Sequence, residues 1–193
     1  MIKEQFTQNK AGWKRSFLEG FSQDENGDAL PWMTYPVIEF LQKTLQPHHE
    51  IFEFGCGAST LFFAKKVKKV TSLETNKNWL ELIKQKLPSK NVEIILMKDG
   101  LTNDLYQNFA KDSGQKFDFI IIDSLKRFEC AKNSITALKP GGVIILDDSE
   151  RKNYQKIFDF LAAQNFVAED FIGIEPGRLR IKKTTIFVNF EKN

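Results

Sequence analysis

The sequence has few residues of the kinds that cross-link a chain or anchor it in a membrane. It holds two cysteines, Cys56 and Cys130, which are too few for a disulfide framework. Its longest uninterrupted apolar runs, residues 119–122 and 143–146, are four residues long, whereas a membrane-spanning helix needs about 20. The first residues do not have the pattern of a secretory signal. We therefore expect reduced thiols, a cytoplasmic location and no membrane partner.

An excess of one charge is also lacking. The 28 basic and 25 acidic side chains leave a net charge of +3, and 23 of the basic residues are lysines spread along the chain. A surface that binds nucleic acid would be concentrated and rich in arginine. The one basic cluster, residues 178–183, lies between two strand-like segments. We interpret it as a solvated hairpin rather than a nucleic-acid contact, so nucleic acid is not an expected partner.

The composition is that of a globular protein with one substantial core. Hydrophobic residues make up 41% and charged residues 27% of the 193 residues. Phenylalanine is frequent, with 18 copies against 3 tyrosines and 3 tryptophans. The first 30 residues are more polar than the rest. We predict an N-terminal arm over residues 1–30 and one domain over residues 31–193, with no room for a separate substrate domain.

The arm contains one periodic feature. Trp13, Phe17 and Phe21 recur every four residues, as on one face of a short helix. This pattern fits a helix packed on the domain, or a partly disordered arm. It also fits a flap that closes over a ligand or over a second subunit, and in the latter case the arm would support a homodimer.

Strand-like and helix-like segments alternate from residue 31 onward. The inner strands are nearly continuous apolar runs, which is typical of a parallel sheet covered by helices on both faces. A short turn at residues 176–177 makes the last two strands antiparallel neighbours. The pattern predicts a three-layer α/β fold with a mostly parallel seven-stranded sheet and an antiparallel C-terminal hairpin. The predicted strands are residues 51–54, 70–73, 92–97, 117–122, 143–146, 166–174 and 184–190.

Acidic residues follow the predicted strands. Four of the first five strands end at or just past a carboxylate, namely Glu74, Asp99, Asp123 and the pair Asp147 and Asp148. Open parallel sheets bind ligands at the carboxyl ends of their strands. Because carboxylates are costly to bury, an ordered row of them at this edge indicates a ligand site.

The first strand leads into a glycine turn that allows two interpretations. Gly55 and Gly57 suit a dinucleotide-binding turn, in which helix N–H groups receive a pyrophosphate. However, Thr60 stands in place of the third glycine, and the carboxylate of Glu53 would repel a pyrophosphate. A ligand with an amino group and a ribose suits these charges better. Glu74 follows Gly57 by 17 residues (74 − 57), close to the spacing of a ribose-binding acid.

In combination, these features resemble the class I S-adenosylmethionine-dependent methyltransferases, whose fold is Rossmann-like, over residues 31–190. Residues 53–57 resemble the family's first motif, which contacts the methionine part of the cofactor. Glu74 matches the acid that binds the ribose hydroxyls, and Asp99 with Gly100 matches the position beside the adenine. Asp123 matches the acid near methyl transfer. The turn at residues 138–142 and the final hairpin also fit the family.

The resemblance implies S-adenosylmethionine as the cofactor. Trp32 and Tyr35, just before the first helix of the domain, would wall the sulfonium side, because an aromatic face attracts a cation. Core packing of that helix entry is the alternative. The implied cofactor-binding residues are Trp32, Tyr35, Glu53, Gly55, Cys56, Gly57, Ser59, Thr60, Glu74, Asp99, Gly100 and Asp123.

The catalytic groups follow from what methyl transfer needs. A base is one means of taking the proton of an oxygen or nitrogen acceptor, and we assign this chemistry to Asp123 and Asp148. The two histidines, His48 and His49, are expected at the opposite end of the sheet. Lys126, Arg127 and Arg151 would hold an acidic group of the substrate or pair with nearby acids.

A metal is the alternative source of this chemistry. Catechol-type relatives hold Mg²⁺ between an acid after strand four and an acid–amide pair after strand five, where this chain has Asp123, Asp147 and Asp148. Asp148 stands where the amide would be, and either member of the pair would also suit a helix cap. Mg²⁺ is therefore not favoured.

The substrate class follows by elimination. Methyltransferases that act on the amino groups of nucleic-acid bases carry an Asn/Asp-Pro-Pro-aromatic run after strand four, whereas residues 123–126 are Asp-Ser-Leu-Lys. We predict a methyltransferase that acts on an oxygen or nitrogen of a small molecule. The alternatives are an NAD-dependent oxidoreductase and a non-catalytic cofactor-binding domain of the same fold.

Overall fold

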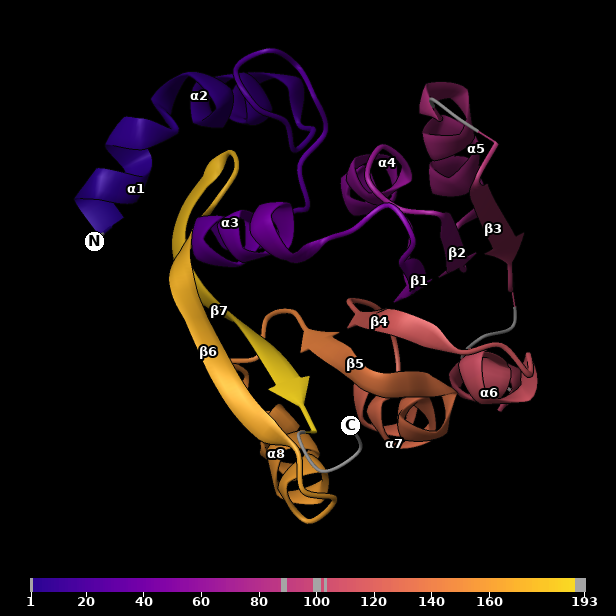
Figure 1. Cartoon of the computed structure of the whole chain (residues 1–193). Coiled ribbons are helices and arrows are strands. Elements are labelled where there is room, and N and C mark those ends of the chain that lie inside the picture. The colour runs from indigo at the N-terminus through magenta and orange to yellow at the C-terminus, as the bar shows by residue number, and fades with distance from the viewer. Residues whose placement is uncertain (1, 88–89, 99–101, 103, 190–193) are drawn as a thin grey trace.

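The fold is built on one seven-stranded sheet, with strand order β3-β2-β1-β4-β5-β7-β6 (Figure 1). The computed structural model describes residues 2–87, 90–98, 102 and 104–189. Strands β1 to β5 pair in parallel, while β7 runs antiparallel to both β5 and β6. The predicted fold class is therefore confirmed. The strands are β1 (Glu50–Phe54), β2 (Lys69–Glu74), β3 (Val92–Leu96), β4 (Phe117–Ile122), β5 (Leu138–Leu146), β6 (Val167–Glu175) and β7 (Arg178–Val188).

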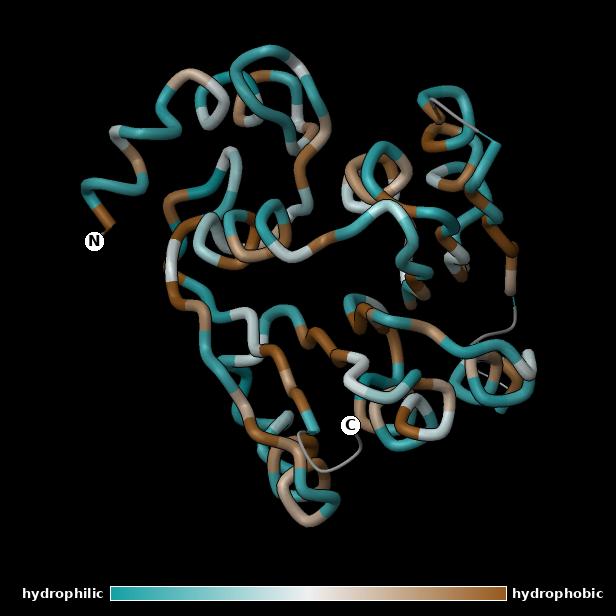
Figure 2. Tube along the Cα trace, in the orientation of Figure 1, coloured by the Kyte–Doolittle hydropathy of each residue, from teal (hydrophilic) through white to brown (hydrophobic). Residues whose placement is uncertain are grey.

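Helices cover both faces of this sheet. Alternate strand residues point to opposite faces, so Ile51 packs toward α3 and α4 whereas Phe52 packs toward α6, α7 and α8. The side chains on each face of the sheet form a buried core that contains several phenylalanines. In Figure 2 the hydrophobic colour marks the last residues of β5 and of β7 in the interior. The helices are α1 (Ile2–Gln8), α2 (Lys10–Glu19), α3 (Tyr35–Thr44), α4 (Ala58–Ala64), α5 (Lys77–Lys86), α6 (Leu105–Asp112), α7 (Arg127–Ser134) and α8 (Gln155–Ala162).

Strand β5 begins earlier than predicted. The Pro-Gly-Gly sequence, expected to form a sharp turn before the strand, lies inside it. The register against β4 shifts between Phe117 and Phe119, and Gly141 has φ +70°, a conformation that favours glycine. A side chain at Gly142 would approach the carbonyl oxygen of Phe117 to 3.0 Å. The glycines therefore form an irregularity within the strand, with pairing on both sides of it.

The N-terminal arm packs on the C-terminal hairpin. The side-chain oxygen of Gln5 in α1 accepts a hydrogen bond from the N–H of Ile174 in β6 at 3.2 Å. At the tip of the hairpin, a side chain at Gly177 would come within 2.9 Å of the backbone nitrogen of Phe17. Of the alternatives for the arm, the structure shows the packed helix, while a homodimer through the arm and a separate status for residues 1–30 stay predictions.

The aromatic repeat in the arm is only partly helical. Trp13 and Phe17 stack in α2 with ring centroids 5.6 Å apart, and Phe17 stays 63% exposed. The helix ends at Glu19, where Gly20 takes a left-handed conformation, so Phe21 lies beyond it. Within the described residues, no helix has both the length and the apolar character to cross a bilayer.

Candidate functional site

The candidate site lies where β1 and β4 end side by side. The chain leaves β1 through Gly55, whose φ of +101° suits glycine. A side chain at Gly55 would lie 3.0 Å from the carbonyl oxygen of Asp123, the residue that follows β4. The N–H of Asp123 donates to the carbonyl of Phe54 at 3.2 Å. The two strand ends are therefore in direct contact, and glycine is what allows it.

A cavity of about 130 Å³ opens beside this contact. Most of the predicted cofactor-binding residues line it, together with Met33, Ala58, Trp79 and Ile121, which were not predicted. The predicted residues that line it are Trp32, Glu53, Gly55, Cys56, Gly57, Ser59 and Asp123. Tyr35 does not line it: this side chain is buried in α3 and borders a different cavity, next to Asn9 and Leu30 of the arm. Asp99 and Gly100 lie outside the described residues.

Glu53 is the buried acid beneath the glycine turn. Its side chain is 1% exposed and accepts hydrogen bonds from the hydroxyls of Ser59 at 2.6 Å, Thr60 at 2.6 Å and Ser72 at 2.8 Å. Burial raises the pKa of Glu53 to about 7, against the opposing effect of the hydroxyl donors. Thr60 also accepts a bond from the N–H of Gly57 at 3.0 Å. Glu53 thus ties the start of α4 to the turn.

Glu74 ties the same turn to the next strand. One carboxylate oxygen accepts the N–H groups of Thr75 and Asn76, both at 2.7 Å, and the other accepts the N–H of Cys56 at 3.3 Å. The Glu74 oxygen that accepts the N–H of Cys56 also lies 3.5 Å from the sulfur of that residue. Burial, together with the negative charge of Glu74, raises the pKa of the Cys56 thiol. Cys56 is therefore a neutral, space-filling residue here. Both cysteines of the chain are free and buried.

Trp79 is a site residue that the sequence analysis missed. Its indole nitrogen donates to the carbonyl of Cys56 at 2.7 Å, and its ring faces Gly57. The periodicity of α5 placed Trp79 on the apolar face of that helix. The available signal was its position in the first turn of a helix that starts at the carboxyl end of β2, just after the cap formed by Asn76.

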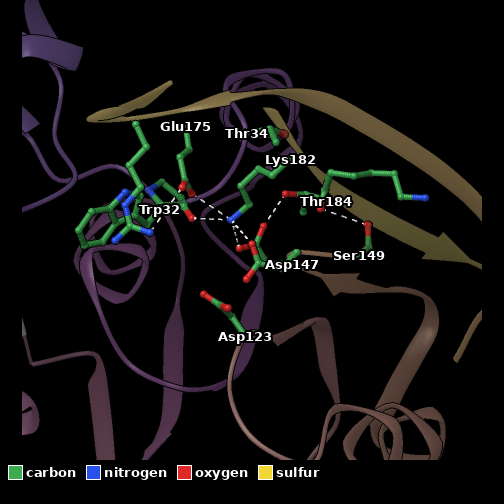
Figure 3. A network of polar contacts seen from close by, with 12 residues as sticks. Trp32, Thr34, Asp123, Asp147, Ser149, Glu175, Lys182 and Thr184 are labelled. Carbon is green, nitrogen blue, oxygen red and sulfur yellow. Dashed lines mark hydrogen bonds and ion pairs between the residues drawn. The ribbon is translucent and has the colours of Figure 1, made fainter. Parts of the chain in front are cut away.

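Three carboxylates meet at the ends of β4 and β5. Oxygens of Asp123, Asp147 and Asp148 lie within 4.8 Å of one another. Asp147 accepts from Lys182 at 2.5 Å and from the hydroxyl of Thr184 at 2.6 Å (Figure 3). The three aspartates and the cations around them form what we call the carboxylate cluster.

Arginines close the outer side of the carboxylate cluster. Asp148 is paired with Arg151 and with Arg180, the latter at 2.8 Å, and Asp123 is paired with Arg127 at 2.8 Å. Arg127 and Arg151 had two predicted roles, binding an acidic group of the substrate or pairing with nearby acids, and in the structure they pair with acids. Neither Asp147 nor Asp148 caps a helix, because Arg151 and Tyr154 occupy the cap positions of the segment that follows.

The three aspartates have different proton affinities. Desolvation by the surrounding protein, with the neighbouring Asp147, raises the pKa of Asp123 to about 7, although Arg127 opposes this and 40% of the side chain is accessible. Burial also raises the pKa of Asp147. For Asp148, burial is outweighed by Lys182 and the arginines, which hold its pKa below the usual range. Asp123 is therefore the member that opens to the cavity and titrates near neutral pH.

The prediction of a solvated hairpin for the basic cluster is wrong for Lys182. Arg178 and Arg180 are about half exposed, but Lys182 is 3% exposed and points inward. The sequence shows only a run of basic residues. Of its partners, Glu175 lies in the same hairpin, whereas Asp147 and Asp148 are distant in sequence and reach it only because β7 pairs with β5.

The histidines lie away from the site, as predicted. They immediately precede β1, at the amino end of the sheet. His49 contacts the ring of Phe119 and accepts a hydrogen bond from the N–H of Gln46 at 3.0 Å.

The carboxylate cluster does not fit a divalent cation as it stands. Mg²⁺ needs near-octahedral oxygen ligands at about 2.0–2.1 Å. The oxygens of Asp147 and Asp148 that would supply them are already bound by Lys182, Thr184, Arg151 and Arg180.

Comparison with known proteins supports the fold and the family. The chain is similar to a precorrin-6y C5,15-methyltransferase from Geobacter metallireducens, with TM-score 0.62 and 16% identity over 79% of this chain and 87% of that one. An rRNA methylase from Streptococcus thermophilus gives TM-score 0.58 and 16% identity over 80% and 95%. The N-methyltransferase NodS from Bradyrhizobium japonicum, in complex with S-adenosylhomocysteine, gives 0.52 and 14% over 78% and 81%. Curated protein sequences give no match.

These identities show a shared fold, whereas the family follows from the sequence itself. The model of a family described as a methyltransferase domain matches residues 52–149, about half of the chain. The matched segment runs from β1 to just past Asp148 and so contains the glycine turn, Glu74 and Asp123. This chain belongs to that methyltransferase-domain family, and its resemblance to the class I S-adenosylmethionine-dependent methyltransferases is confirmed.

Proposed function

We propose that this chain transfers the methyl group of S-adenosylmethionine to an oxygen or nitrogen of a small molecule. The observation that carries the proposal is that the glycine turn and Asp123 line one cavity at the carboxyl ends of β1 and β4, while Glu74 at the end of β2 binds the N–H of Cys56 in that turn. The complex of NodS with S-adenosylhomocysteine supports the choice of cofactor, because the two folds are alike.

The turn presents open backbone to a ligand. A side chain at Gly57 would meet nothing nearer than Trp79, at 3.9 Å, so this glycine leaves space for a ligand rather than relieving a clash. One oxygen of Glu74 accepts two N–H groups, and the other accepts the N–H of Cys56 and lies 3.5 Å from its sulfur. A ribose hydroxyl would take the place of this weak thiol contact. Ligand pockets usually enclose about 300–1,000 Å³. The cavity therefore holds only part of the cofactor, and the rest would extend toward Glu74.

Asp123 is the group we propose as the base. When bound, S-adenosylmethionine supplies an electrophilic methyl group. Asp123 would take the proton that the acceptor oxygen or nitrogen loses when it is methylated. A carboxylate with a pKa of about 7 is matched to this task at neutral pH. Arg127 orients it from the side away from the cavity. Asp148, which binds three cations, is in our proposal a positioning residue.

The same geometry supports a small acceptor. A nucleic-acid backbone would be bound by a row of arginines that have no carboxylate partner. The arginines nearest this site are instead paired with carboxylates. One neighbour of the same fold acts on rRNA, so the fold does not decide the substrate. The proposal rests on the local charges and on the absence of an Asn/Asp-Pro-Pro-aromatic run after β4.

Calorimetric titration with S-adenosylmethionine, S-adenosylhomocysteine and NAD tests the cofactor. We expect binding of the first two, and binding of NAD alone would overturn the proposal. Release of S-adenosylhomocysteine with a panel of phenols, carboxylic acids and primary amines then tests transfer. Asp123→Asn should keep cofactor affinity and lower the transfer rate by about 10²–10⁴-fold, whereas Asp159→Asn, on the exposed face of α8, should change neither. Cofactor binding without transfer to any acceptor would favour the non-catalytic alternative.

A further inference from the structure

We infer that the ammonium group of Lys182 is the resident cation of the carboxylate cluster and takes the place that a divalent metal would occupy beside the transfer site. For the transfer step this inference rests on the proposed function. For the cluster itself it rests only on the contacts that follow.

Lys182 is coordinated much as a small ion would be. Its nitrogen lies 2.5 Å from Asp147, 2.9 Å from Asp148 and 3.0 Å from Glu175, with the carbonyl oxygen of Trp32 at 3.4 Å. An ammonium group has three N–H donors, and three carboxylates and one carbonyl surround it. Figure 3 shows the nitrogen between Glu175 and Asp147, reaching down from β7.

The position of Lys182 is fixed by the fold. The side chain is 3% exposed, and its backbone is held in the β6–β7 pairing opposite Gly173. The neighbouring Lys183 is instead 20% exposed and pairs with Asp170 on β6. Adjacent residues of a strand point to opposite faces, so only Lys182 can reach the carboxylates. The charge thus sits on a rigid element rather than on a loop.

The two most buried carboxylates beside Lys182, Asp147 and Glu175, share its ammonium group as their close counter-charge. Asp147 and Glu175 are each about 2% exposed, and Lys182 is the cation within 3.0 Å of both. Without it, two buried carboxylates would have no close counter-charge among the described residues, although Arg178 lies 3.7 Å from the outer oxygen of Glu175. Removing one partner of a buried ion pair is strongly destabilising. A divalent ion could take this place only if Lys182 left it.

Lys182 also connects the cluster to the cavity wall. The same nitrogen that binds Asp147 contacts the carbonyl of Trp32, and the Trp32 side chain lines the cavity. The indole nitrogen of Trp32 donates to Pro176 at 2.9 Å, and Arg178 stacks on its ring at 4.5 Å. Lys182 is accordingly a positioning residue that orients both the acids and the wall, without touching the reacting atoms.

The test is a titration with Mn²⁺ in which the signal of the free ion is monitored by electron paramagnetic resonance. Wild type and the matched control Lys183→Ala should bind no stoichiometric Mn²⁺. Lys182→Ala should bind about one equivalent, with an affinity about tenfold or more above wild type, because Asp147 and Glu175 then lack the ammonium group that lies within 3.0 Å of both. Its melting temperature should rise when Mn²⁺ is added. This readout needs no transfer activity, so it is independent of the proposed function.

Two results would overturn the inference. One is stoichiometric Mn²⁺ binding by wild type that Asp147→Asn abolishes. The other is a folded Lys182→Ala that binds no Mn²⁺. If Lys182→Ala does not fold even with Mn²⁺, the paired variant Asp147→Asn/Lys182→Met decides, because it removes one charge of each sign. Recovery of a folded protein then supports the role of Lys182 as counter-ion, and failure to recover it contradicts that role.

Discussion

The indole nitrogen of Trp79 and the carbonyl oxygen of Cys56 are 2.7 Å apart, so the first turn of α5 is fastened to the glycine turn that follows β1. This bond closes one side of the cavity, because both residues line it. It joins two segments that are each anchored to Glu74, through the N–H of Cys56 and that of Asn76. The turn is therefore held from both sides before any ligand arrives.

Loss of this bond should be measurable. Trp79→Phe keeps an aromatic ring but removes the donor, so we expect the free energy of unfolding to fall by about 1 kcal/mol, with weaker binding of S-adenosylhomocysteine. Trp13→Phe is the matched control, because the buried indole nitrogen of Trp13 has no hydrogen-bond partner among the described residues. Chemical denaturation and calorimetry provide the two measurements. Equal losses in both variants would show that the hydrogen bond is unimportant.

Glu74 should contribute directly to cofactor affinity. Glu74→Ala removes the proposed acceptor of the ribose hydroxyls as well as the anchor of two loops. We expect the affinity for S-adenosylmethionine to weaken by about 1.5–3 kcal/mol, the scale of hydrogen bonds to a charged group. Glu81→Ala, on the exposed side of α5, should leave it unchanged. Undiminished affinity in Glu74→Ala would mean that the ribose lies elsewhere.

Gly55 should tolerate no side chain. Gly55→Ala would combine a left-handed backbone with a contact of 3.0 Å to the carbonyl oxygen of Asp123. Gly114 also has a positive φ, of +68°, but nothing lies within 4 Å of the added atom. Gly114→Ala should therefore cost only the backbone strain, about 1–3 kcal/mol. A larger loss of stability in Gly55→Ala, measured by urea unfolding, is the expected result, and similar losses would argue against a close strand contact.

The buried acid Glu53 should make stability depend on pH. Its pKa is about 7 in the folded protein and about 4.5 in the unfolded chain, so the folded state binds more protons between these values. Stability is then lost as the pH rises from 4.5 through 7, by about 3 kcal/mol for this group. Relative to Glu53→Gln, which does not titrate, wild type should weaken across that window.

The variant Glu50→Gln should show the opposite dependence of stability on pH. The pKa of Glu50 is lowered, by its hydrogen bond to Lys68 and by Lys139 against a smaller effect of burial. Its contribution to stability is therefore present above the unfolded pKa and is lost as the pH falls. Unfolding of both variants from pH 4 to 8 compares the two slopes. A flat difference between wild type and Glu53→Gln would show that Glu53 is ionised normally.

The sequence predicted the sheet well because the signals for it are local. Apolar runs predicted the inner strands, and the short turn at residues 176–177 predicted the final hairpin. The order of the strands was not predicted, because it depends on pairing between segments that are distant in the sequence. The bulged start of β5 was missed because the Pro-Gly-Gly sequence suits a turn as well as a bulge, and only pairing with β4 decides between them.

The site was predicted at the level of residue types and less well at the level of partners. The glycine turn and Asp123 meet as expected, because strand ends in a parallel sheet share one edge. Tyr35 and Lys182 show the limit. Some of their neighbours, Asn9 for Tyr35 and Asp147 for Lys182, are far away in the sequence, so the direction in which Tyr35 points and the burial of Lys182 depend on tertiary packing. No local pattern contains that information.

The β6–β7 hairpin contacts both the first helices of the chain and the carboxylate cluster. Gln5 satisfies the N–H of Ile174 in β6, and the very next residue along the chain is Glu175, a partner of Lys182. Two residues further on, Gly177 lies against α2. A substitution in the first 20 residues can therefore shift the hairpin and, with it, the position of Glu175 beside Lys182, although none of those residues lines the cavity.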